Sequence, residues 1–193
     1  VGCDVNLSLG FCYNGDDNDE GVLGYGLNPP SVGVDFFEGP TIDTTINGVD
    51  TSIELGLSKF VFYNNDQNQI NGNPFAPSDF YNYLQGKWRT GADIQYGGDG
   101  NAGTDGTKAD YMFPGKSDST HTAPWTEEGA GNLPADRRFL QSSGPFILKP
   151  GAVQNLTVGV VWARAPFGGA SGSLSLLKEA SKKAQSLFNS CFD

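Results

Sequence analysis

The segment LTVGVVWA, residues 156–163, carries the strongest strand signal of the chain and sets the expected fold. Val158, Val160 and Val161 form its centre, and β-branched side chains fit the pleated surface of a sheet. A Pro150-Gly151 turn separates it from residues 145–148, which also have an extended character. We therefore predict that these two runs pair antiparallel.

Two runs closer to the N-terminus have the same character. Residues 32–37, VGVDFF, and residues 57–63, LSKFVFY, are rich in strand formers and are followed by turn residues. The polar stretch between them, residues 41–54, has a turn signal at Asn47-Gly48. These patterns predict several antiparallel strands.

Two helices are expected. Residues 78–84, SDFYNYL, predict a short one. From residue 174 onward the apolar side chains recur every three or four positions, which is typical of an amphipathic helix. These positions are Leu174, Leu177, Ala180, Ala184, Leu187 and Cys191. We expect a terminal helix that lies on the sheet.

The expected fold class is mostly β, an antiparallel β-sandwich-like domain with long loops and a C-terminal amphipathic helix. We divide the chain into an irregular acidic segment, residues 1–31, and a β-rich domain with the terminal helix, residues 32–193. The chain opens with VGCDV and no signal peptide, so we interpret it as a segment of a longer protein.

The charge distribution excludes one class of partner. Net charge is −10, and residues 1–58 hold ten acidic residues but no lysine or arginine. Nucleic-acid binding needs clustered basic side chains, so no nucleic acid is expected as a partner. No apolar run is long enough to span a bilayer.

The cysteines indicate the compartment. The three of them, Cys3, Cys12 and Cys191, have no metal-binding spacing, and the acidic, Gly- and Asn-rich composition suggests an extracellular setting where disulfides persist. The preferred disulfide is Cys3–Cys12, and a pairing of Cys191 with either one stays open.

Several segments resemble a family of large secreted proteins of the Bacteroidetes. They are FVFYNN at 60–65, FYNYL at 80–84, GKW at 86–88, DRRFLQSSGPF at 136–146, LKPGAV at 148–153 and VGVVWARA at 158–165. The resemblance covers about residues 29–193. It implies a cell-surface or extracellular protein exported by type IX secretion, and it brings no catalytic residues with it.

The stretch GDDNDEG, residues 15–21, places four carboxylates within five positions. Carboxylates this close repel one another unless a cation or water screens them, and Ca²⁺ prefers oxygen ligands in flexible loops. We predict a calcium site with ligands from Asp16, Asp17, Asn18, Asp19 and Glu20. A second candidate loop offers Asp99, Asn101 and Asp105. The alternative at the first place is a solvated acidic loop, and at the second an ordinary flexible loop rich in turn-forming residues.

Aromatic side chains suggest another function. Trp88, Tyr96 and Trp125 lie in or near predicted loops, and exposed rings of this kind stack on sugars. A carbohydrate-binding module is therefore the alternative function. The other interpretation of these rings is that they fill the hydrophobic core. Asp-Thr and Asp-Ser sequences also mark Thr44, Thr51 and Ser119 as candidate O-glycosylation sites, by resemblance to sites used in the Bacteroidetes.

A secreted hydrolase is the third reading, but no residues converge in the sequence pattern to indicate its active site. The single histidine, His121, lies in a polar stretch, and Glu127 and Glu128 are adjacent, whereas two glycosidase carboxylates face each other across a sugar. We predict a non-enzymatic extracellular surface module, calcium-stabilised, with a scaffold, adhesion or assembly role. Its partners would be its own copies, other surface proteins or glycans.

Overall fold

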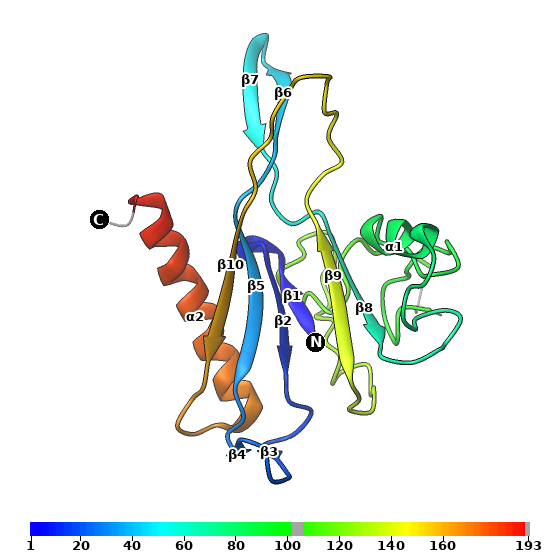
Figure 1. Ribbon diagram of the computed structural model, residues 1–193, viewed down its shortest axis with the longest axis vertical. Helices are drawn as coiled ribbons and strands as arrows, with labels where there is room; N and C mark the ends of the chain where they lie inside the picture. The colour runs from blue at the N-terminus through cyan, green and yellow to red at the C-terminus, as the bar shows by residue number, and fades with distance from the viewer. Residues whose placement is uncertain (102–105, 192–193) are drawn as a thin grey trace.

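The structure is a computed structural model that describes residues 1–101 and 106–191. Antiparallel sheets dominate it, and a long helix lies at the C-terminal end (Figure 1), so the mostly-β prediction is confirmed. Its elements are β1 (Gly2–Asp4), a 3₁₀ turn (Val5–Leu7), β2 (Leu9–Tyr13), β3 (Asn18–Asp19), β4 (Gly26–Leu27), β5 (Ser31–Glu38), β6 (Thr41–Ile46), β7 (Val49–Glu54), β8 (Lys59–Asn64), α1 (Pro77–Leu84), β9 (Arg137–Ser142), β10 (Thr157–Ala163) and α2 (Gly169–Asn189).

The largest sheet has four antiparallel strands in the order β1-β2-β5-β10. Two of them come from the first 31 residues, so the prediction that this segment is irregular is wrong for β1 and β2. Their alternating side chains are buried, with Leu9 and Phe11 packed beneath α2 and Cys3 on the opposite face in the core. The pairing of β2 with β5 joins the N-terminal segment to the rest of the chain.

The predicted hairpin around Pro150-Gly151 is also wrong. β10 pairs with β5, Val160 opposite Val34, and the segment 145–148 forms no strand. The strand that precedes the turn, β9, pairs instead with β8. Long-range pairing in a sheet outweighs a local turn signal here, because β5 offers β10 a full-length partner with apolar side chains on both faces.

A projecting arm extends from the molecule above the sheets (Figure 1) and consists of residues 41–54 and 143–156. Its hairpin, β6–β7, turns at Asn47-Gly48, as the sequence predicts, with both residues at positive φ. Gln154 ties the two parts together, because its side chain accepts the Thr41 N–H at 2.8 Å and donates to the Thr41 carbonyl at 2.9 Å.

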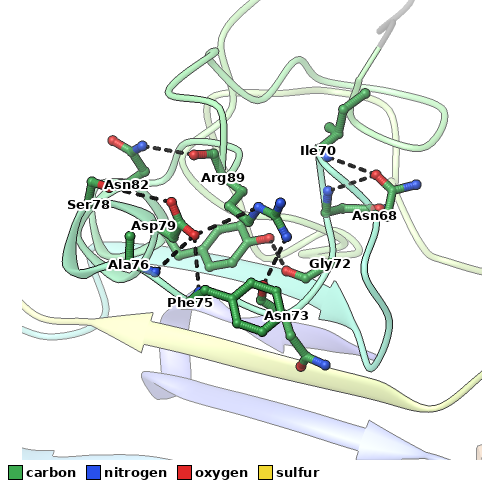
Figure 2. A network of polar contacts seen from close by, with 12 residues as sticks. Asn68, Ile70, Gly72, Asn73, Phe75, Ala76, Ser78, Asp79, Asn82 and Arg89 are labelled. Carbon is green, nitrogen blue, oxygen red and sulfur yellow. Dashed lines mark hydrogen bonds and ion pairs between the residues drawn. The ribbon is translucent and has the colours of Figure 1, made fainter.

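Helix α1 confirms the expected short helix, and a polar network fixes it to the loop before it (Figure 2). Asp79 accepts the backbone N–H of Phe75 at 3.1 Å and that of Ala76 at 3.2 Å. These two donors hold the pKa of Asp79 below its usual value. Arg89 lies beside Asp79 and donates to the Asn73 carbonyl at 3.0 Å.

Two apolar clusters form the core. The larger one is aromatic and lies where β1 and β8 meet the loops of residues 88–125, with Phe60, Phe62 and Trp88 among its members. The smaller one lies beneath α2, where Leu177 packs with Leu9 and Phe11. The helix therefore lies on the sheet as the apolar period predicts. No helix within the described residues is long and apolar enough to cross a membrane.

Candidate functional site

Strand β10 forms one edge of the largest sheet, and it is apolar and exposed. Among the described residues no strand pairs with its outer edge. Its side chains alternate: Val161 and Ala163 are buried toward α2, while Val158, Val160 and Trp162 are 45%, 74% and 54% exposed. Edge strands of proteins that stay monomeric are usually short, charged, interrupted by proline or covered. β10 has seven residues, no charge and no proline.

The outward face of the sheet is covered at one side and open at the other. One row of side chains runs across the strands through Cys3, Gly10, Val34 and Val160. Cys3 and Gly10 are buried against β8 and β9, Val34 is half-buried and Val160 is largely exposed. β9 reaches as far as β5, where Gln141 donates to the Val34 carbonyl at 3.2 Å and Phe36 packs against the aromatic cluster. The face over β10 lies beyond these contacts and is an exposed apolar surface.

The other edge of the same sheet is protected. β1 has three residues, and its Cys3 N–H donates to the Phe113 carbonyl at 3.3 Å. The outer edge of β8 is protected in a similar way, because the Phe60 N–H donates to the Asp110 carbonyl at 3.1 Å. The open edge of β10 thus stands apart from these two edges.

The acidic loop is organised by donors of the chain itself. Asp16 accepts the Asn18 N–H at 3.0 Å, Asp19 accepts the Tyr25 N–H at 2.9 Å, and Glu20 accepts the Asn18 amide at 3.1 Å. Asp17 reaches the first turn of α2, where it accepts the Ala170 N–H at 3.0 Å. Each of the four carboxylates therefore accepts from a different donor group of the chain, two of which belong to Asn18.

The second candidate loop is only partly described. Asp99 accepts the Asn101 N–H at 2.9 Å, and Asp105 lies outside the described residues. The indole N–H groups of Trp88 and Trp125 donate to the carbonyls of Gly100 and Gly98, so two tryptophans hold this loop. Within the described residues no three His, Cys, Asp or Glu side chains are grouped to hold a metal. Calcium binding stays a prediction from the sequence.

The aromatic residues suggested for sugar binding are part of the core. Trp88, Tyr96 and Trp125 are all buried. Tyr96 stacks on the His121 ring with centroids 3.7 Å apart, and Trp125 packs edge-on against Phe113. The expectation of an exposed platform is wrong for these three residues, because in a chain with few aliphatics the rings fill the interior.

The predicted Cys3–Cys12 disulfide is absent, and all three cysteines are free thiols. Cys3 lies opposite Gly10 in the ladder, so Cys12 is two residues further along β2. Diagonal neighbours of this kind are about 7–8 Å apart, whereas a disulfide needs β-carbons about 4 Å apart. Burial raises the pKa of Cys3 well above its usual value and that of Cys12 to about 11.

The polar residues considered for catalysis have structural partners. Nδ1 of His121 lies 3.1 Å from the Asp118 carboxylate and 2.9 Å from the Thr120 hydroxyl. Glu127 binds the N-terminal ammonium group and Arg137 Nε, the latter at 2.7 Å. Burial raises the pKa of Glu127, but these two cations outweigh it and hold the pKa below its usual value.

A cleft of about 820 Å³ lies between α1, the end of β9 and the projecting arm. Lys59, Lys87 and Lys108 line it together with apolar side chains such as Phe146. Two of the lysines are neutralised, Lys59 by Asp110 at 2.5 Å and Lys108 by Asp93 at 3.3 Å. The cleft therefore has little net positive charge.

The three candidate glycosylation positions lie on the surface. Thr44 and Thr51 face each other across the β6–β7 hairpin, with Thr44 half-buried and Thr51 exposed, and Ser119 is exposed beside Asp118. The structure places them where a modification has room, and glycosylation stays a prediction.

Comparison with family models, with curated proteins and with solved structures found no match for this chain. The fold defines its class as a mostly-β protein with a C-terminal helix. The features that bear on its function are the exposed strand β10 and the residues that surround it.

Proposed function

We propose that this chain is an extracellular, non-enzymatic surface module with an assembly role, and that it binds its partner as a strand added along β10. The observation that carries the proposal is the unpaired edge of β10 together with the exposed face of Val158, Val160 and Trp162. Strand addition uses both features, because main-chain hydrogen bonds supply affinity and alternate side chains supply specificity.

Other observations support the remaining parts of the proposal. The acidic, Gly- and Asn-rich composition and the resemblance to secreted Bacteroidetes proteins favour an extracellular surface. His121 is hydrogen-bonded to Asp118, and Glu127 to Arg137, in contacts that hold the fold together, which favours a role without catalysis.

A synthetic strand tests this proposal. A labelled peptide of sequence TVGVVWA, flanked by lysines for solubility, is titrated with the full chain while fluorescence anisotropy is recorded. We expect saturable binding, and we expect a peptide with proline in place of the central valine to bind at least about tenfold more weakly, because proline cannot donate to a ladder.

Equal binding of the two peptides, or binding of neither at a chain concentration where sedimentation shows a monomer, would contradict strand addition. Cross-titration with the Val49→Lys variant is the control, because Val49 is an exposed strand valine on a different sheet. That variant should bind the peptide as the unmodified chain does.

A further inference from the structure

We infer that the partner at β10 is a second copy of this chain, paired antiparallel about a two-fold axis that passes beside Val160. This inference rests on the proposed function, because it takes β10 as the contact strand. It adds the identity of the partner and the register of the pair.

The sequence of β10 is suited to pairing with itself. Val160 is the central residue of Thr157–Ala163. In the antiparallel register centred there, Val160 lies opposite the partner subunit's Val160, and Val158 lies opposite the partner subunit's Trp162. Aromatic and β-branched residues form favourable cross-strand pairs, and an antiparallel edge is self-complementary under a two-fold axis. All three side chains lie on the same exposed face of the sheet.

Charge favours this strand over other surfaces for contact between copies. The chain has a net charge of −10, so two copies repel each other, and a contact at an uncharged surface adds the fewest close pairs of like charge. β10 has no ionisable side chain. The charged neighbours at its ends are held within the chain: Glu38 accepts the Thr157 hydroxyl at 2.8 Å, and Arg164 donates to the Tyr25 carbonyl at 2.7 Å.

The helix extends the apolar surface past the edge. Lys178 binds Asp4 of β1 at 3.0 Å, so its side of α2 faces the protected edge of the sheet. Successive helical residues turn by about 100°, which places Leu187 on the opposite side of α2, toward β10. Leu176 lies on the same side about three turns earlier, and both leucines are exposed. In the two-fold pair the two α2 helices lie on the same face of a continuous sheet and meet across the axis.

Pairing through β10 also gives a closed assembly. The order of strands becomes β1-β2-β5-β10 followed by the same four in reverse, so both outer edges are the short, protected β1 strands. A two-fold contact of this kind stops at two copies, whereas a head-to-tail contact would continue into a filament.

A charge exchange at position 160 tests the inference. Sedimentation velocity of the full chain is measured over a range of concentrations for the unmodified protein and for the variants Val160→Lys and Val160→Glu. We expect the unmodified chain to dimerise, and each variant alone to have a dimer dissociation constant raised at least about tenfold, because like charges meet at the axis. An equimolar mixture of the two variants should regain the dimer.

Each outcome decides a part of the inference. An unmodified chain that stays monomeric, or a dimer that Val160→Lys leaves intact, overturns it. A mixture that stays monomeric overturns the antiparallel register at Val160. Val49→Lys should leave the dimer unchanged, and circular dichroism checks that every variant is folded. If the chain is monomeric and yet binds the strand peptide, the inference fails while the proposed function stands. If the chain is monomeric and the peptide does not bind, both fail.

Discussion

At the residue scale, Asp35 is an ionisable side chain that lies in the interior, where a charge is unfavourable. It is 0% exposed, Ser181 donates to its Oδ2 at 2.5 Å, and its Oδ1 has no partner among the described residues. Burial raises its pKa from 3.8 to about 6, although the Ser181 hydrogen bond opposes the shift. A raised carboxyl pKa stabilises the fold below the unfolded value of 3.8, and that stability is lost as the pH rises through about 6.

Replacing Asp35 with asparagine should therefore stabilise the protein at neutral pH and remove this pH dependence. The upper bound is about 3 kcal/mol at pH 7.5, at ~1.4 kcal/mol per pH unit, and the gain should shrink toward pH 4. Urea unfolding at both pH values measures it, with Asp43→Asn on the exposed face of β6 as the control. A variant less stable than the unmodified protein at pH 7.5 would contradict this account of Asp35.

Asp17 has a structural role that its neighbours in the acidic loop lack. Its carboxylate lies at the first turn of α2, where unpaired N–H groups and the helix dipole favour negative charge. We expect Asp17→Asn to lower the free energy of unfolding by about 0.3–1 kcal/mol, and the loss to shrink in 1 M salt. Asp16→Asn is the matched control, because Asp16 bonds only within its loop. Equal effects of the two variants would argue against a role of Asp17 at the helix.

Calcium remains to be measured. If the carboxylates at residues 16–20 bind the ion, added calcium should raise the melting temperature, because a ligand that binds only the folded state stabilises it. About 2.7 kcal/mol is expected at a hundredfold excess over the dissociation constant. A melting temperature that neither calcium nor a chelator moves would remove the calcium prediction.

The sequence could not show how the acidic loop is arranged. Four carboxylates within five positions are visible in it, but the partner of Asp17 lies 153 residues away, at Ala170. Cys3 and Cys12 pose the same problem. Their spacing suits a loop closure, whereas the register of β1 with β2 decides their actual separation.

At the scale of elements, the local sequence pattern predicted most of the strands and helices but few of the pairings between strands. The valines of β10, the aromatic residues of β8 and the apolar period of α2 each indicate the correct type of structure. β1 and β2 were missed because they are short and lie between turn-forming residues. β10 has apolar residues at odd and at even positions, a pattern that suggests a strand buried on both faces. The sequence therefore does not reveal that one face is exposed, which only the structure shows.

Gly10 shows how closely the four-stranded sheet approaches the β8–β9 sheet. A β-carbon there would lie 2.3 Å from Gln141 Oε1 and 2.7 Å from the Phe60 ring. Gly10→Ala should therefore push β2 away from β8 and β9 and cost about 1–3 kcal/mol, as overpacking does elsewhere. Chemical denaturation measures the change. An unchanged free energy of unfolding would show that the sheets have room at this point.

At the scale of the whole molecule, the largest sheet is protected at its β1 edge and unpaired at its β10 edge. One face of β2, β5 and β10 carries α2, the other face is covered over β1 and β2, and the far edge is left open (Figure 1). Uncovered apolar surface beside an unpaired strand is costly for an isolated protein and useful for one that assembles. The central claim is that β10 is the place where this molecule meets its partner.

Hydrogen exchange of the full chain at low and high concentration tests that claim most directly. Because an added strand protects edge amides, the backbone amides of β10 should exchange more slowly at high concentration. Those of β7, in the hairpin of the projecting arm, should exchange at the same rate in both samples. Equal exchange of β10 at both concentrations, in samples that sedimentation shows to differ in dimer content, would contradict it.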